Sequence, residues 1–177
     1  TNVSGAWGTT TVDSTTSANT GEYTSIAVGT SGAVYISYRD ATNTNLMYAT
    51  NVSGAWGTTT VDSTTSANTG EYTSIAVGTS GAVYISYRDA TNTNLMYATN
   101  VSGAWGTTTV DSTTTANTGE YSSIAVGTSG AVYISYLDNT NVNLMYAANP
   151  THTAVTGAAS GVSTSGATLG GTANATG

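Results

Sequence analysis

A repeat of 49 residues constrains this chain more than any other feature. Residues 1–49 recur without a single change as residues 50–98, and they recur again as residues 99–147 with five changes. Three copies account for 147 residues, so a tail of 30 residues remains. Each copy must adopt the same structure, and the surface of one copy must fit the surface of the next.

Each copy contains four short stretches of strand-forming residues separated by turn residues. In the first copy they are residues 6–12, 23–28, 33–38 and 45–49, which are rich in Thr, Val, Ile and Tyr. Residues 29–32 (Gly-Thr-Ser-Gly) form a hairpin-type connection between two of them. No stretch shows an apolar period of 3.6 residues, so the pattern favours strands over helices.

Four short strands in a repeat of this length are typical of a β-propeller blade. The sequence therefore predicts an all-β fold with three four-stranded blades, at residues 1–49, 50–98 and 99–147. A β-solenoid is the alternative, although its coils are usually shorter. The rest divides into a linker at residues 148–152 and a strand-forming tail at residues 153–177.

The composition removes most enzyme chemistry. The chain has no Cys, one His and two basic residues against nine acidic ones, which gives a formal net charge of −7. Disulfides and cysteine nucleophiles are excluded, and His-based triads and multi-His metal sites nearly so. A basic footprint for nucleic acid is absent, and no apolar run is long enough to span a membrane. We expect a protein that is not an enzyme and has no cofactor, no nucleic-acid partner and no membrane insertion.

Two segments of each copy resemble a known family. Residues 23–38 (YTSIAVGTSGAVYISY) and 40–49 (DATNTNLMYA), preceded by Trp7 and residues 11–14 (TVDS), resemble the blade repeats of secreted bacterial β-propellers. The resemblance covers residues 1–147 and implies a propeller fold and an extracellular or cell-surface location. Sialidase-type Asp boxes are missing, so the resemblance implies no glycosidase activity.

The tail resembles a different family. Residues 153–177 resemble the first two strands of bacterial fibronectin type III-like domains. A sandwich of this kind needs about 100 residues, by analogy with immunoglobulin-like domains. We expect the tail strands to have no partner in this chain. Either the chain is then a piece of a longer protein, or the tail completes another subunit by strand addition.

Two functions are compatible with these features. The sparse charge, the tandem repeats and the tail favour a non-catalytic structural or adhesive protein, a filament or surface-appendage subunit that self-associates through blade contacts and tail strand addition. The alternative is a multivalent, lectin-like propeller that binds cell-surface or matrix glycans. Its candidate glycan-binding residues, for which inter-blade packing is the competing interpretation, are Trp7, Trp56 and Trp105.

Polar residues of the repeat offer weaker candidates. Asp13, Glu22 and Asp40 could supply a carboxylate pair for hydrolysis, and residues 40–45 could supply oxygens to a cation, but roles in turns are the stronger interpretation. Asn-X-Ser/Thr sequons mark candidate N-glycosylation sites at Asn2, Asn51, Asn100 and Asn174.

The repeat also predicts assembly. Three blades are fewer than a closed propeller needs, so we expect further blades or a second chain, most simply three blades plus three. If residues 23–28 form the innermost strand, the Trp-containing strand of each copy is the outer edge of the preceding blade. Residues 6–12 are then free to complete a blade built by other residues. Three of the five changes in the third copy cluster at one corner. The candidate assembly contacts from this corner and the tail are Leu137, Val142, Val155, Val162 and Leu169.

Overall fold

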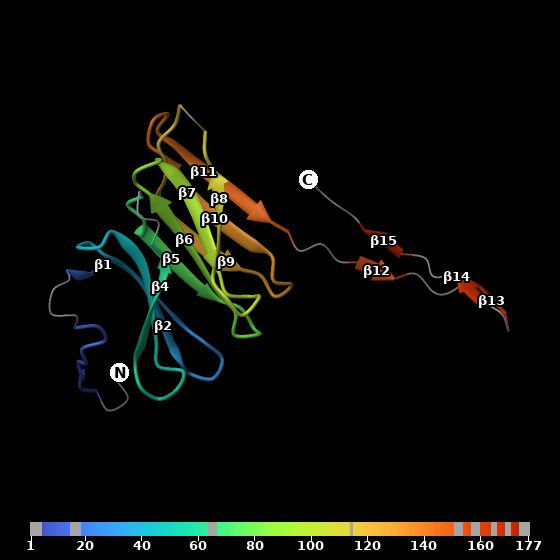
Figure 1. The fold of residues 1–177 in the computed structure, drawn as a ribbon, viewed down its shortest axis with the longest axis horizontal. Helices are drawn as coiled ribbons and strands as arrows, with labels where there is room; N and C mark the ends of the chain where they lie inside the picture. The colour runs from blue at the N-terminus through green and yellow to red at the C-terminus, as the bar shows by residue number, and fades with distance from the viewer. Residues whose placement is uncertain are drawn as a thin grey trace.

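The structure is a computed structural model that describes residues 5–14, 19–63, 67–113 and 115–150, together with four short strands of the tail. The described residues form an all-β fold of 15 strands (Figure 1). Among them there is no helix long and apolar enough to cross a membrane. Nor do these residues gather three or more His, Cys, Asp or Glu side chains that could hold a metal ion.

Two antiparallel sheets of four strands and one of three make up the repeat region. We call them blades 1, 2 and 3. Blade 1 has the order β1 (Thr20–Val28), β2 (Val34–Asp40), β3 (Asn45–Thr50), β4 (Gly57–Asp62). Blade 2 repeats it with β5 (Glu71–Val77), β6 (Val83–Asp89), β7 (Asn94–Thr99), β8 (Gly106–Asp111). Blade 3 has β9 (Thr118–Val126), β10 (Val132–Asp138), β11 (Asn143–Asn149).

The fourth strand of each complete blade comes from the following copy of the repeat. β4 belongs to the second copy and pairs with β3 of the first, and β8 belongs to the third copy and pairs with β7 of the second. The expectation that the Trp-containing strand forms the outer edge of the preceding blade is therefore confirmed. As a consequence, blade 3 is three-stranded, and the prediction of three four-stranded blades was wrong for this one.

Residues 6–12 form no strand, contrary to the sequence-based prediction. The segment nevertheless lies against blade 1 as β4 lies against blade 2. Tyr38 donates a hydrogen bond to Asp13 (2.6 Å), just as Tyr87 donates one to Asp62 (2.7 Å). What the segment lacks is a paired strand, since β4 pairs with β3 and the described residues place no such neighbour beside residues 6–12.

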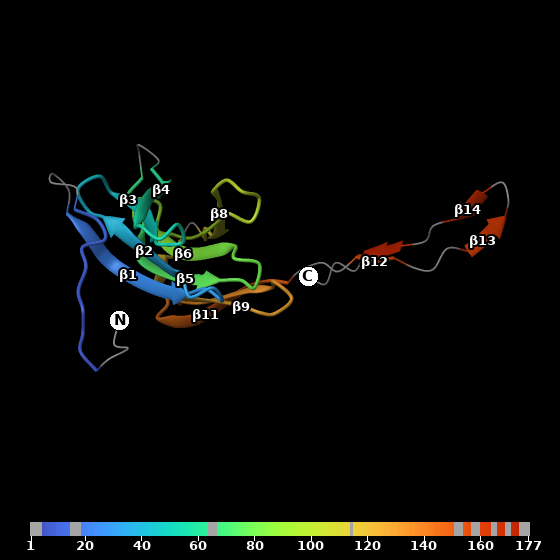
Figure 2. The ribbon, with the colours of Figure 1, turned by 90° about the horizontal axis from the view of Figure 1, so that it is seen from below.

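The tail strands pair with one another. β12 (Ala154–Thr156) pairs with β15 (Gly171–Ala173), and β13 (Ser160–Ser163) pairs with β14 (Gly166–Thr168). Figure 2 shows these two ribbons extending away from the blades. The expectation that these strands have no partner in this chain was wrong, while strand donation by the tail stays a prediction.

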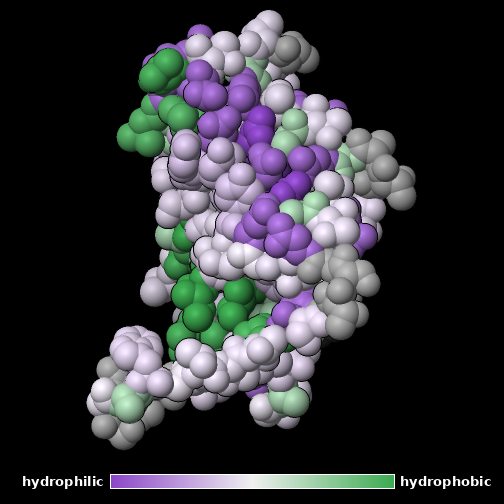
Figure 3. All heavy atoms as spheres, turned by 90° about the vertical axis from the view of Figure 1, so that its left-hand side faces the viewer, coloured by the Kyte–Doolittle hydropathy of each residue, from purple (hydrophilic) through white to green (hydrophobic). Residues whose placement is uncertain are grey.

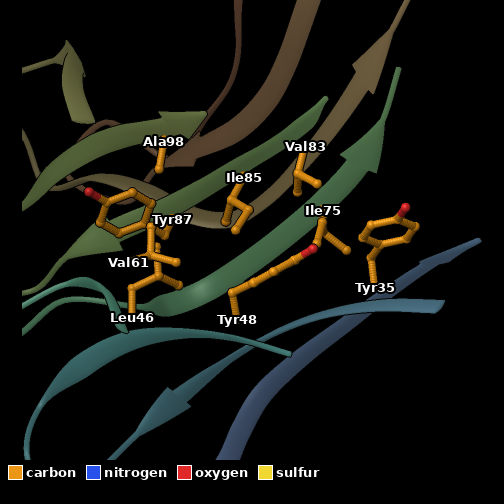
Figure 4. Packing of buried hydrophobic residues seen from close by; sticks show 9 residues of the cluster. All are labelled: Tyr35, Leu46, Tyr48, Val61, Ile75, Val83, Ile85, Tyr87 and Ala98. Carbon is orange, nitrogen blue, oxygen red and sulfur yellow. The ribbon is translucent and has the colours of Figure 1, made fainter. Parts of the chain in front are cut away.

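Consecutive blades pack through hydrogen bonds and through an apolar core. On the inner strands, the Ser25 hydroxyl accepts a hydrogen bond from the Ile75 backbone (3.2 Å), and Ser74 does the same for Ile124 (3.2 Å). Farther out, larger side chains of blades 1 and 2 fill one core (Figure 4). Its members are Tyr35, Leu46, Tyr48, Val61, Ile75, Val83, Ile85, Tyr87 and Ala98.

An arginine links each of the first two blades to the next. Arg88 forms an ion pair with Glu71 (2.6 Å) and donates from Nε to Asn117, which precedes β9 of blade 3 (3.0 Å). Arg39 repeats this arrangement at the edge of blade 1 with Glu22 (2.6 Å). The two carboxylates differ in burial, since the Glu71 side chain is 16% exposed and that of Glu22 is 40% exposed.

We predict that Arg88→Leu lowers the free energy of unfolding by about 3 kcal/mol, because Glu71 would keep a buried charge without its partner. Arg39→Leu should cost about 1 kcal/mol or less, because water can solvate the exposed Glu22. Urea unfolding of both variants at pH 7 measures the difference. Equal losses of unfolding free energy would show that burial of the carboxylate does not determine how much the ion pair stabilises the fold.

Buried tyrosines also tie blades 2 and 3 each to the end of the fourth strand of the preceding blade. The hydroxyl of Tyr87 is fully buried and donates to Asp62, and Tyr136 donates in the same way to Asp111 (2.7 Å). Burial first, and then the hydrogen bond and negative charge of the carboxylate, raise the pKa of Tyr87 far above the ordinary value of 10.0. The folded state therefore holds this proton at pH values where the unfolded state releases it.

The sign of the pH effect follows from this difference. As the pH rises above 10, the unfolded chain loses the proton first, so the free energy of unfolding should fall by about 1.4 kcal/mol per pH unit for Tyr87. In Tyr87→Phe this contribution to the slope should disappear. Urea unfolding between pH 8 and pH 11 measures both slopes, and identical slopes would contradict the assignment.

Candidate functional site

Three tyrosines form a row on the inner strands of the blades. Tyr23 lies on β1, Tyr72 on β5 and Tyr121 on β9, and these strands run side by side (Figure 2). The ring centroids are 4.9 Å and 4.7 Å apart, and consecutive ring planes are tilted by 51° and 52°. Tyr121 is 69% exposed, Tyr23 is 40% exposed, and Tyr72 is half-buried between them. We call this feature the tyrosine row.

The backbone is distorted at each position of the row. All three tyrosines have a positive φ, between 50° and 51°, which is rare for a bulky side chain. In blade 1 the pairing of β1 with β2 shifts register between Glu22 and Ser25, so that a bulge carries Tyr23. A bulge changes the direction of a side chain, and such distortions concentrate at functional sites. The same distortion in all three copies keeps these rings out of the two hydrophobic cores.

A glutamate precedes each tyrosine, and its surroundings differ between blades. In blade 3, Leu137 replaces the arginine, and Glu120 is held instead by the side-chain amides of Asn117 (3.0 Å) and Asn139 (3.3 Å). Asn139 is itself one of the five changes of the third copy, where the second copy has Ala90. In the third copy an amide donor, Asn139, therefore accompanies the loss of the arginine beside Glu120.

The central hydroxyl of the row stays protonated at neutral pH. Burial, the negative charge of Glu120, the neighbouring tyrosines and a hydrogen bond with Tyr121 raise the pKa of Tyr72 to about 12. A hydroxyl of this kind is a hydrogen-bond donor and a poor nucleophile. The row therefore offers aromatic faces, hydroxyl groups and a carboxylate that can accept hydrogen bonds. These groups can recognise a ligand, and they include no activated nucleophile.

The three tryptophans proposed from the sequence occupy three different environments. Trp105 is half-buried and packs edge-on against Tyr48 of the neighbouring blade, with centroids 5.2 Å apart. Trp56 is half-buried and lines a cavity beside residues 8–10. Trp7 is 80% exposed. For Trp105 the inter-blade packing interpretation is confirmed, and the structure does not bring the three tryptophans together into one site.

The other sequence candidates have structural contacts where they are described. The side-chain oxygen of Asn51 accepts a hydrogen bond from the Val34 backbone (2.8 Å), and Asn100 does the same for Val83 (2.8 Å). Asp40 accepts bonds from backbone amides of its own turn, as expected for a turn residue. Candidates that lie outside the described residues, or whose side chains are not described, are Asn2, Asn174, Val155, Val162 and Leu169.

The two described assembly candidates of the third copy differ in exposure. Leu137 is half-buried, and Val142 is 80% exposed. Val142 has a φ of 56°, in the left-handed region that a β-branched residue rarely adopts. Its counterpart Thr93 has the same conformation and directs its carbonyl oxygen to the Thr118 backbone of the next blade (2.9 Å). A contact of either residue with the tail stays a prediction.

Comparisons with known proteins found similar solved structures but no similar family model or curated sequence. Among solved structures, the chain is similar to a fucose lectin from Kordia zhangzhouensis in complex with methyl-fucoside. The TM-score is 0.47 and the sequence identity is 12%, over 71% of this chain and 90% of that chain.

Proposed function

We propose that this protein is a non-catalytic carbohydrate-binding module that acts outside the cell and recognises neutral sugars at the tyrosine row. The observation that carries the proposal is the exposed, backbone-strained row of Tyr23, Tyr72 and Tyr121. Large aromatic rings at a surface, left out of the cores in all three copies, need a purpose other than packing.

The chemistry of the row suits a polyhydroxylated ring. The aromatic faces can stack against the C–H groups of a pyranose, and the tyrosine hydroxyls and Glu120 can form hydrogen bonds with its hydroxyl groups. Small-molecule binding sites usually combine a mostly apolar surface with a few polar groups.

The charge of the row selects among sugars. Glu120 has no arginine partner, and the chain carries a formal net charge of −7. Sialylated, sulfated or uronic-acid glycans would meet electrostatic repulsion at this surface. We therefore expect neutral hexoses and deoxyhexoses to bind, and acidic glycans to be rejected.

A glycan array followed by calorimetry tests the function. The wild-type chain should bind one class of neutral glycan saturably, and Tyr72→Ala and Tyr121→Ala should each weaken binding about ten-fold, the equivalent of one lost aromatic contact at about 1.4 kcal/mol. Tyr121→Phe should lose less, since the ring remains.

Val101→Ala is the matched control, because Val101 is 64% exposed on the loop between β7 and β8, whereas the row lies on β1, β5 and β9. Its binding should equal that of the wild type. An array without saturable binding, or tyrosine variants with wild-type affinity, would overturn the proposal.

A further inference from the structure

One end of the blade stack exposes residues whose copies are fully buried. Leu46 and Leu95 have 0% exposure because the next blade covers them, whereas Leu144, in the same position of blade 3, is 86% exposed. Tyr146 is 65% exposed, whereas Tyr48 is 8% exposed. This face of blade 3 therefore carries the same side chains that the next blade covers in blades 1 and 2.

The opposite end shows the complementary pattern. Ile75 and Ile124 are 6% and 8% exposed between blades, whereas Ile26 of blade 1 is 64% exposed. Figure 3 faces this side of the molecule and shows apolar residues gathered on it. Residues 8–12 lie across this face and, together with Ile26, line a cavity of about 490 Å³.

A second cavity marks a missing side chain. Between blades 2 and 3 a hollow of about 200 Å³ is lined by Tyr97 and by strands β8, β10 and β11. Between blades 1 and 2 the equivalent tyrosine, Tyr48, is covered by Trp105 from the fourth strand of blade 2. Among the described residues, blade 3 has no fourth strand to supply such a tryptophan. Residues 8–12 have the sequence of a fourth strand but belong to no sheet, and the exposed Trp7 precedes them.

The edge of β11 is also unpaired among the described strands. β3 and β7, its equivalents in the first two blades, each pair with a fourth strand in the same register: Ala49 opposes Thr58, and Ala98 opposes Thr107. Shifting this register by one repeat places Ala147 opposite Thr9. An edge with an exposed apolar face is a site for strand addition.

We propose that a second copy of this chain covers both ends: residues 6–12 of one chain become the fourth strand of blade 3 in the other, and Trp7 fills the cavity beside Tyr97. The second copy is the occupant because its residues 6–12 repeat the sequence of the fourth strands β4 and β8, which make this contact in blades 1 and 2. The contact is heterologous, so two chains can make it twice and close a ring. Propellers have about four to eight blades, and six is the only multiple of three in that range.

Light scattering with size-exclusion chromatography tests the assembly without any sugar, so its outcome is independent of the glycan proposal. The wild-type chain should run at twice the mass of one chain. Leu144→Asp and Trp7→Ala should run as single chains, with Leu144→Asp keeping its β circular dichroism because the replaced side chain is exposed. Val101→Asp is the control, since Val52 and Val101 are equally exposed, at 62% and 64%, and lie outside the contact.

Crosslinking tests the register, because the chain has no native Cys. Thr9→Cys chains mixed with Ala147→Cys chains should form a disulfide-linked pair under an added mild oxidant, which takes up the two electrons and two protons of the thiols. Either variant alone, or Val101→Cys mixed with Ala147→Cys, should not. A wild-type chain with the mass of one chain, an open series of larger masses, or a Leu144→Asp variant that stays paired would overturn the proposal.

Discussion

The contact between one blade and the next is the interaction on which the rest of the structure depends. It combines backbone hydrogen bonds to serine hydroxyls, an apolar core and close approaches at glycine. Gly70 has a φ of +89°, and a Cβ atom there would lie 2.9 Å from the Cα atom of Leu46. Gly119 stands in the same relation to Leu95. Only glycine allows both the backbone conformation and the close approach, so these positions set the distance between sheets.

Because the first two copies are identical, the same side chain can be seen in two different surroundings within one chain. Ile26 and Ile75 occupy the same position of these two copies, and their exposures are 64% without a blade over them and 6% between blades. Burial here is a property of the neighbour and not of the residue. A fold built this way has two unfinished ends whenever its blades do not close on themselves, and the apolar area at those ends favours association.

The candidate site depends on the same contact. The inner strands approach closely enough for Tyr23, Tyr72 and Tyr121 to touch across blades, so the row exists only when the blades are stacked. In the proposed ring, Tyr121 of one chain would lie beside Tyr23 of the other, and the row would continue from chain to chain. Binding and assembly would then share one scaffold, although each uses different residues.

The sequence by itself determined the repeat, the strand-forming stretches of each unit and the hairpin connection, since these follow from local turn chemistry and an exact period. The outer position of the Trp-containing strand followed only if residues 23–28 were innermost, and the sheet order decided that. The sequence could not decide which aromatic side chains pack and which face solvent. Tyr72 and Tyr87 look alike in the sequence, yet a bulge directs one to the surface row while the other has 0% exposure. Nor could it show that residues 6–12 lack a strand partner, because their strand propensity equals that of β4. The burial of the blade faces and the ring contacts of the tyrosine row join residues about 50 positions apart, and only the tertiary structure brings those together.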